Sequence, residues 1–395
     1  MRIGVVTTSF PRHPGDPAGH FVGAHVEHLR AEGHAVDVVA AGDAEPRRHA
    51  RGAGAPEAQA QERTVTRVPS RLFYRGGAPE ALAAATLGAG AAAGLAIAAR
   101  LAAATARRAR GWDATCAHWL VPAALAAPLT RGPLLAVAHG GDVHVLRRAH
   151  LLTPVLLTLL ARGTRLVFVT AELAALARAA VPPALRARFD AAALVRPMGV
   201  DVARLAAARD HTARPQPRRY ALVLARLAPI KGVELAVRAL SHVRAPVELV
   251  IAGDGPERGA LERLARASGR AVRFLGEVST LERDRWLAHA DAVLVPSRRL
   301  DDGRGEGLPQ AAIEALAAGV PLLASAAGGL AELAAPARVL PLEERDPRAW
   351  ASALDELLAA PPARGALRAL AATHDWPRVA AALRAHWRLP RSEPR

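Results

Sequence analysis

The stretch RYALVLARLAPIKGVELAVRAL, residues 219–240, joins a short apolar run to a second run with helical spacing. RYALVLA (219–225) predicts a strand that is buried on both faces, and VELAVRAL (233–240) predicts a helix. Pro229 and Gly232 favour a tight turn between them. A strand, turn and helix in this order form the repeating unit of a parallel sheet covered by helices.

The same alternation continues on both sides of this stretch. Further strands are predicted at 246–253, 271–276, 291–297 and 321–325, and an earlier series at 2–8, 35–40, 64–69, 113–118, 133–139 and 165–170. The polar, proline-rich segment 197–220 favours a link between the two series. We therefore expect an α/β protein with two doubly wound parallel sheets, in domains at 1–200 and 201–374. The proline- and charge-rich segment 41–63 is predicted to be a loop.

The charge of the chain is strongly positive, and nearly all of it is arginine. Of 52 basic residues only Lys231 is lysine, the formal charge is +16, and residues 1–200 carry 23 Arg against 13 acidic residues. Such a charge suits a polyanion or an anionic membrane face. No finger, helix-turn-helix or RNP-type pattern is present, so we expect no nucleic-acid partner.

Cysteine content and hydropathy indicate the compartment. The single cysteine, Cys116, excludes an internal disulfide and a multi-cysteine metal site, which suits the cytoplasm. The Ala- and Gly-rich run 81–99 predicts a packed helix rather than a membrane span. The apolar run at the start of the chain is too short for a signal peptide, because polar residues follow it closely. LLTPVLLTLLARGTR (151–165) is either a buried helix or a patch for peripheral contact with the inner face of a membrane.

Arg226 and Lys231 follow the predicted strand 219–225, at its carboxyl end. Two cations beside a helix N-terminus form a site for a diphosphate. Because the chain has no other lysine, the position of Lys231 favours a function there. The alternative is a solvated surface lysine.

Two glutamates lie in DDGRGEGLPQAAIEALAAGVP, residues 301–321. A helix is expected from Pro309 to Gly319, with Glu306 just before it and Glu314 inside it. This spacing suits two sets of sugar-like hydroxyls on one elongated ligand, and the backbone N–H groups of Gly307 and Leu308 would bind phosphate. The alternatives are a capping carboxylate for Glu306 and an exposed helix glutamate for Glu314.

In AHGGDVH (138–144), His139 and Gly140 follow another predicted strand. The imidazole would lie at the rim of a cleft, where glycines let a ligand approach the backbone. The alternative is a buried or turn-forming histidine. Gly19, near the start of the first helix, is a candidate contact for phosphate or sugar, whereas His25 in that helix is interpreted as a bystander.

These stretches together resemble the family 4 retaining glycosyltransferases, in the family's order over about residues 1–335. The matching motifs are GHFV, AHGGDVH, PMGVD, ARLAPIKG, VIAGDGPE, FLGEV, DAVLVPS, DDGRGEGLPQAAIEALAAGVPLLAS and AAGGLAE. The most specific element is Glu306 to Glu314, which resembles the family's E-x7-E motif. The resemblance implies the GT-B fold, with two Rossmann-like domains facing across a cleft, and a terminal helix within 375–395 that joins the first domain.

The resemblance also implies roles for individual residues. In relatives the residues at the positions of Arg226 and Lys231 bind the donor diphosphate, and the residue at the position of Glu314 binds the ribose. The position of Glu306 contacts the donor sugar, and the position of His139 lies at the reacting centre. The positions of Gly276 and Val278 lie beside the base. Two positions depart from the family: Met198 replaces a usual Asn, and Ala18 precedes Gly19 where relatives often carry two glycines.

The activity implied is retaining transfer of a hexose-type sugar from a nucleoside-diphosphate sugar to a glycan, lipid-linked or small-molecule acceptor. No D-x-D pair is present, because Asp301 and Asp302 are adjacent. Arg226 and Lys231 would supply the positive charge, so we expect no metal and no cofactor. The alternatives are a nucleotide-sugar epimerase of the same fold, a non-catalytic nucleotide-sugar-binding protein and a basic polyanion-binding protein.

Overall fold

The computed structural model describes residues 1–12, 16, 18–42, 64–70, 87–127, 130–301 and 303–389. The chain forms two compact units: unit 1 comprises Met1–Pro197 and Ala380–Arg395, and unit 2 comprises Met198–Val379. The sequence analysis placed the domain limits at residues 200 and 374, with a helix within 375–395 joining the first domain. Most of the loop expected at 41–63 and the start of the helix expected at 81–99 lie outside the described residues.

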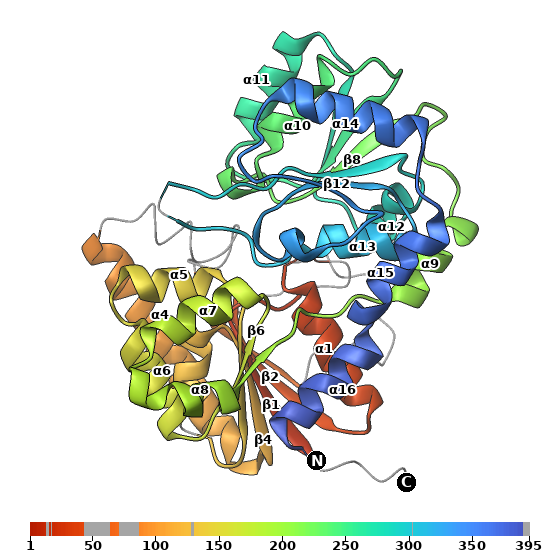
Figure 1. The fold of residues 1–395 in the computed structure, drawn as a ribbon. Helices are drawn as coiled ribbons and strands as arrows, with labels where there is room; N and C mark the ends of the chain where they lie inside the picture. Colours follow the sequence, from red (N-terminus) through yellow and green to blue (C-terminus); the bar gives the residue numbers. More distant parts are fainter. Residues whose placement is uncertain are drawn as a thin grey trace. The chain divides into compact units, whose positions relative to one another are not determined.

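Unit 1 is built on a seven-stranded sheet in the described part of the chain (Figure 1). Its strands are β1 (Arg2–Thr7), β2 (Ala35–Gly42), β3 (Val65–Pro69), β4 (Ala114–His118), β5 (Leu134–Ala138), β6 (Arg165–Phe168) and β7 (Ala193–Val195). They lie in the order β3-β2-β1-β4-β5-β6-β7, and every pairing is parallel. The strands buried at its centre are apolar on both faces, as parallel sheets require.

Helices cover both faces of this sheet. They are α1 (His20–Ala31), α4 (Leu87–Arg108), α5 (Gly141–Arg148), α6 (Leu152–Ala161), α7 (Ala171–Ala180), α8 (Arg186–Ala192) and α16 (Trp376–Trp387). Figure 1 shows α1 and α16 on one side of the sheet and α5 to α8 on the other. From Ala380 onward α16 belongs to unit 1, where His386 contacts the carbonyls of Leu166 and Ala192.

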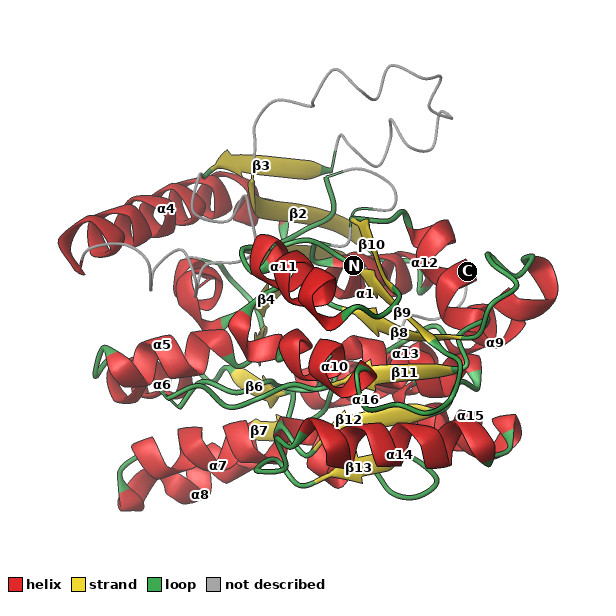
Figure 2. Ribbon diagram, turned by 90° about the horizontal axis from the view of Figure 1, so that it is seen from above, coloured by secondary structure: helices red, strands yellow, loops and turns green. Residues whose placement is uncertain are grey.

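Unit 2 repeats the architecture with six strands among the described residues (Figure 2). The strands are β8 (Tyr220–Leu224), β9 (Glu248–Ala252), β10 (Val272–Gly276), β11 (Ala292–Val295), β12 (Leu322–Ser325) and β13 (Arg338–Leu340). They lie in the order β10-β9-β8-β11-β12-β13, again all parallel. The helices are α9 (Val202–His211), α10 (Val233–Leu240), α11 (Arg258–Ser268), α12 (Thr280–Ala288), α13 (Gln310–Ala318), α14 (Pro347–Ala359) and α15 (Arg364–Ala371).

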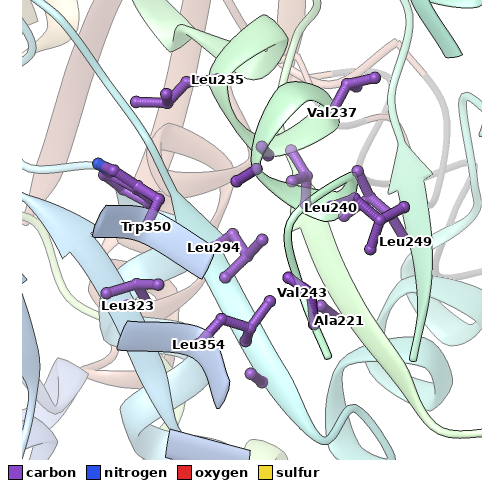
Figure 3. Close-up of a cluster of buried hydrophobic side chains, with 14 of the residues drawn as sticks. Ala221, Leu235, Val237, Leu240, Val243, Leu249, Leu294, Leu323, Trp350 and Leu354 are labelled. Carbon is purple, nitrogen blue, oxygen red and sulfur yellow. The ribbon is translucent and has the colours of Figure 1, made fainter. Parts of the chain in front are cut away.

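Alternate residues of the strands of unit 2 supply two separate cores. Leu249 and Ile251 of β9 pack with α10, α11 and α14, whereas Val250 and Ala252 pack with α9, α12, α13 and α15. Figure 3 shows the first core, in which Trp350 and Leu354 of α14 lie near Leu294 of β11 and Leu323 of β12, and Leu249 of β9 lies near Leu240 of α10. This burial on both faces explains the uninterrupted apolar runs of the sequence.

The expected fold class is confirmed, and each predicted strand is present with its ends shifted by two residues at most. The prediction missed β7 and β13, which have three residues each and lie at sheet edges. One helix start was wrong: α13 begins at Gln310, and Pro309 precedes it with a non-helical ψ of 119°.

The described residues include no single helix with the length and hydropathy of a membrane span; α5 and α6 reach that measure only as a pair bent by 117°. Five residues of α6 are buried, and Leu151 just before it is 51% exposed.

Replacing Leu249 by Ala should lower the free energy of unfolding of unit 2 by about 2–5 kcal/mol, because the side chain is fully buried and a cavity would remain. Leu281→Ala makes the same chemical change at a side chain that is 71% exposed and should cost less than about 0.5 kcal/mol. Urea unfolding followed by far-UV circular dichroism measures both. Equal losses would contradict the packing described for the first core.

Candidate functional site

The loop after β8 places Lys231 at the start of α10. The N–H of Leu227 donates to the carbonyl of Asp254 and so connects this loop to the loop after β9. The N–H of Lys231 donates to the carbonyl of Ala228 and closes a single 3-10 turn, Pro229–Lys231. Gly232 then has φ 60°, and a Cβ there would lie 2.2 Å from the carbonyl oxygen of Pro296. Only glycine fits this position without strain, and its close approach fixes where α10 begins.

Lys231 and Glu306 form an ion pair. The Lys231 Nζ lies 2.6 Å from Glu306 Oε1, and the two side chains are 24% and 11% exposed. Lys231 is therefore not a solvated surface lysine. Arg226 is partly buried in the same loop, and its carbonyl accepts a hydrogen bond from Ala228.

Arg298 ties the Lys231 loop to the segment that follows β11. Its Nε donates to the carbonyl of Pro229 at 2.8 Å, and its backbone N–H donates to the carbonyl of Ile230 at 2.9 Å. The sequence analysis did not identify Arg298. It lies just past the predicted strand 291–297, so the rule that selected Arg226 would also have selected it.

The loop that carries Glu306 rests on two glycines of η7 (Gly328–Glu332). The N–H of Gly329 donates to the carbonyl of Gly307 at 2.9 Å. Gly328 has φ 53°, and a Cβ there would lie 2.2 Å from the carbonyl oxygen of Glu306 and 2.3 Å from that of Gly307. The AAGGLAE motif thus supports the backbone of the Glu306 loop.

Glu314 lies in α13 and is only 5% exposed, so the exposed-helix alternative is wrong. Its Oε1 lies 3.2 Å from Nη1 of Arg283 in α12. Arg283 also contacts Asp284, which pairs with Arg204 of α9. A carboxylate buried among apolar helices requires such partners, because an unpaired buried charge is costly.

Arg283 is the second residue that the sequence analysis missed. It lies in the first turns of α12, whose start is fixed by a capping box between Ser279 and Glu282. Its partner Glu314 is 31 residues away in sequence. No local pattern predicts the contact, which depends on the packing of α12 against α13.

The remaining predicted positions of unit 2 lie at the same edge of the sheet. Gly276 ends β10 with φ 74°, and its carbonyl accepts a hydrogen bond from Gly253 at 2.7 Å. Val278 and Leu308 are partly buried against the second core. Because the described strands of this sheet are all parallel, the segments after β8, β10 and β11 lie at the same edge, and these residues share that edge with Lys231 and Glu306.

In unit 1, His139 follows β5, and its backbone is held by Asp142. The Asp142 carboxylate accepts hydrogen bonds from the N–H groups of Leu120, His139 and Gly140, at 2.7, 3.2 and 3.0 Å. Burial raises the pKa of Asp142, and the backbone donors oppose that rise. The Gly140 N–H therefore already has a partner, and Gly140, with φ 109°, serves the turn itself.

Gly19, the other predicted contact in unit 1, precedes α1 with φ 67°. A Cβ at this position would lie 2.4 Å from the carbonyl oxygen of Ser9, so the glycine permits the loop after β1 to pass close to the helix start.

Aromatic rings surround the imidazole of His139. The ring centroids of Trp119 and Phe21 lie 4.7 and 4.9 Å from that of His139. His118, the last residue of β4, contacts it through a 3.0 Å Nδ1···Nε2 hydrogen bond. Burial lowers the pKa of His139 to about 3, so its imidazole is neutral at physiological pH.

One group of possible metal ligands occurs in the described part of the chain: His25, Cys116 and His118, whose ligand atoms lie within 4.8 Å of one another. All three side chains are buried. The sequence analysis missed this cluster and interpreted His25 as a bystander. His118 ends a predicted strand, so its position was available as a signal.

Residues 218–360 match the family described as Glycosyl transferases group 1. A GDP-mannose-dependent monoacylated alpha-(1-6)-phosphatidylinositol monomannoside mannosyltransferase of Corynebacterium glutamicum is 35% identical over 153 residues, 38% of this chain and 40% of that protein. A D-inositol 3-phosphate glycosyltransferase of Xylanimonas cellulosilytica is 32% identical over 215 residues, 51% of this chain and 49% of that protein. The matches thus span half or less of these curated relatives.

Solved structures resemble the whole chain. Anabaena HepE, in complex with UDP and glucose, has a TM-score of 0.67 at 18% identity, and sucrose-phosphate synthase from Thermosynechococcus elongatus has a TM-score of 0.68 at 20% identity. Both alignments cover 98% of each chain. At these identities the likeness establishes the fold, which is GT-B.

Gly328→Ala should loosen the Glu306 loop, because the added Cβ would overlap two carbonyl oxygens and the residue has a positive φ. We expect faster amide hydrogen exchange at Gly329 and over residues 304–308. Gly365→Ala is the matched control, because Gly365 lies in α15 with no atom within 4 Å of the added Cβ. Unchanged exchange in Gly328→Ala would contradict the supporting role of this glycine.

Proposed function

We propose that this chain, whose residues 218–360 match the group 1 glycosyl transferases, transfers a sugar from a nucleoside-diphosphate sugar to an acceptor hydroxyl. The observation that carries the proposal is the Lys231–Glu306 pair, held beside the N-terminus of α10 at the carboxyl edge of the sheet of unit 2.

Lys231 can hold Glu306 and a phosphate at the same time. An ammonium group has three N–H donors, and one suffices for Glu306 Oε1 at 2.6 Å. As the sugar departs from the diphosphate, negative charge grows on the phosphate oxygens, and a fixed cation stabilises that charge without reorganisation. Arg226, in the same loop, would add a planar donor to the diphosphate.

Glu314 would bind the ribose of the donor. A carboxylate accepts up to about four hydrogen bonds, more than the contact with Arg283 uses. That contact orients the Glu314 carboxylate in a site where it is 5% exposed. Gly276 and Val278, at the end of β10, would lie beside the base, and Gly307 and Leu308 would offer backbone N–H groups to phosphate.

Glu306 of unit 2 would contact the donor sugar, and His139 of unit 1 would form a hydrogen bond with a sugar hydroxyl. A neutral imidazole provides a hydrogen bond but no charge, which suits a hydroxyl better than a phosphate. We place Glu306 as a group that orients the sugar and Lys231, with transfer that retains the anomeric configuration. Gly19 and Gly140 would allow close approach through their backbone conformations.

The relatives suggest which donor and acceptor to test first. The Corynebacterium protein is named as GDP-mannose-dependent, and both curated relatives are named for acceptors that carry inositol phosphate. We therefore propose a hexose-type donor, with GDP-mannose as the first candidate, and a glycan, lipid-linked or small-molecule acceptor. The excess of arginine in residues 1–200 would favour an acceptor at an anionic membrane face, in the cytoplasm.

Lys231→Ala should weaken the binding of one nucleoside diphosphate by about 10- to 100-fold, the range for a lost charge-assisted hydrogen bond. Calorimetric titration with GDP, UDP and ADP identifies the base and measures the loss. Arg263→Ala, which removes one positive charge from an exposed position of α11, should leave the affinity unchanged. If none of the three nucleotides binds the unmodified protein, the proposed donor site is wrong.

Turnover of the donor sugar should continue in EDTA, because Arg226 and Lys231 supply the positive charge. The product should keep the anomeric configuration of the donor, as read from the anomeric coupling in its proton NMR spectrum. An absolute requirement for a divalent metal, or an inverted product, would contradict this part of the proposal. Conversion of the donor without any acceptor would instead favour the epimerase alternative.

A further inference from the structure

Three histidines of unit 1 form a continuous hydrogen-bonded chain. His25 Nδ1 lies 3.1 Å from His118 Nε2, and His118 Nδ1 lies 3.0 Å from His139 Nε2. The residues come from α1, the end of β4 and the loop after β5, so the contact is a product of the fold. The planes of His118 and His139 differ by 19°, which suits an in-plane N–H···N bond.

The chain couples the proton positions of all three rings. A neutral imidazole has one N–H donor and one acceptor nitrogen, and each contact requires one of each. If His25 donates to His118, then His118 donates to His139, and His139 carries its proton on Nδ1. If the direction is reversed, His139 Nδ1 is an acceptor. The chain therefore has two neutral arrangements, and the one that the further contacts of His25 favour sets the tautomer of His139.

The surroundings keep this chain neutral. His118 is 0% and His25 1% exposed, and burial lowers the pKa of His25 to about 4 and that of His118 well below its usual range. In the described part of the chain neither His118 nor His139 pairs with a carboxylate. Burial also raises the pKa of the neighbouring Cys116 thiol, which stays protonated.

We propose that His118 and His25 are positioning residues that fix the tautomer and ring orientation of His139, so that its Nδ1 presents one defined polar group to a sugar hydroxyl. The inference rests on the proposed function, in which His139 forms a hydrogen bond with a sugar hydroxyl. With Nε2 engaged by His118, Nδ1 is the nitrogen left for a ligand, and Trp119 and Phe21 restrict rotation of the ring.

A metal ion on His25, Cys116 and His118 would be a different use of the same residues. Coordination requires a lone pair from each imidazole directed at the metal, whereas in the 3.1 Å contact one of the two nitrogens carries a proton. A metal bound to these two nitrogens would therefore break the chain at its first link, so that the two uses of this contact exclude each other.

The test compares His118→Leu, which removes both hydrogen bonds, with His118→Asn, whose amide can replace the bond to His139. His242→Leu makes the same change at an exposed histidine of unit 2 and serves as the control. Two-bond ¹H–¹⁵N spectra of histidine-labelled protein report the tautomer, and the signal of His139 is assigned by its loss in His139→Gln. Calorimetry with a nucleoside diphosphate and its sugar conjugate reports binding.

In the unmodified protein we expect one neutral tautomer of His139, unchanged down to about pH 5. His118→Leu should give a mixture of tautomers. The sugar conjugate should bind His118→Leu about fivefold more weakly than it binds the unmodified protein, as for one lost hydrogen bond. The affinity for the nucleoside diphosphate itself should be unchanged. His118→Asn should restore part of the lost affinity for the sugar conjugate, and His242→Leu should change nothing.

An unchanged His139 tautomer in His118→Leu would overturn the proposal. So would one equivalent of zinc in the purified protein that Cys116→Ser removes. Failure of every nucleotide to bind would instead refute the proposed function, and the spectra would still decide whether the chain positions His139.

Discussion

The parallel pairing of every described strand is the constraint on which this molecule depends. Neighbouring parallel strands cannot be joined by a tight turn, so each needs a crossover that returns to the opposite edge, and in the described part of the chain most crossovers contain an α-helix. The helices bury both faces of each sheet, and the loops that follow the strands are more polar than the strands themselves. In unit 2 this gathers the segments after β8, β10 and β11 at one edge, although they are up to 80 residues apart in sequence.

At that edge, partly buried ion pairs connect the loops and helices. Desolvating a charge is costly, and a buried pair contributes little net stability, yet removing one partner leaves the other uncompensated. The pairs Lys231–Glu306 and Arg283–Glu314 are therefore better understood as positioning devices than as sources of stability. Each connects a loop or helix to a neighbouring element, and each leaves hydrogen-bonding capacity for a ligand.

Most of the fold could be predicted from the sequence, because apolar runs of five to eight residues separated by helical spacing dictate a parallel sheet. The edge strands β7 and β13 could not, since three half-exposed residues carry no distinguishable pattern. His139 and Lys231 were identifiable because they lie in segments that follow buried strands, and Glu306 because it precedes the helix predicted after the strand 291–297. Arg283 and His25 were not, since both lie inside helices and acquire their partners only through packing.

The arginine-rich composition gives the single lysine its significance. Elsewhere in the chain the ion pairs of basic side chains use arginine, whose planar group binds a carboxylate in a fixed orientation. An ammonium is a compact charge on a flexible stem, and it can keep Glu306 while turning its other donors toward a second anion. The lysine ammonium can therefore contact a phosphate oxygen while it stays paired with Glu306, which is useful where negative charge grows as a bond breaks. A planar guanidinium bound to Glu306 would have to break that contact to bind the phosphate. The chemistry at the sheet edge therefore favours lysine at position 231 even in a chain that uses arginine everywhere else.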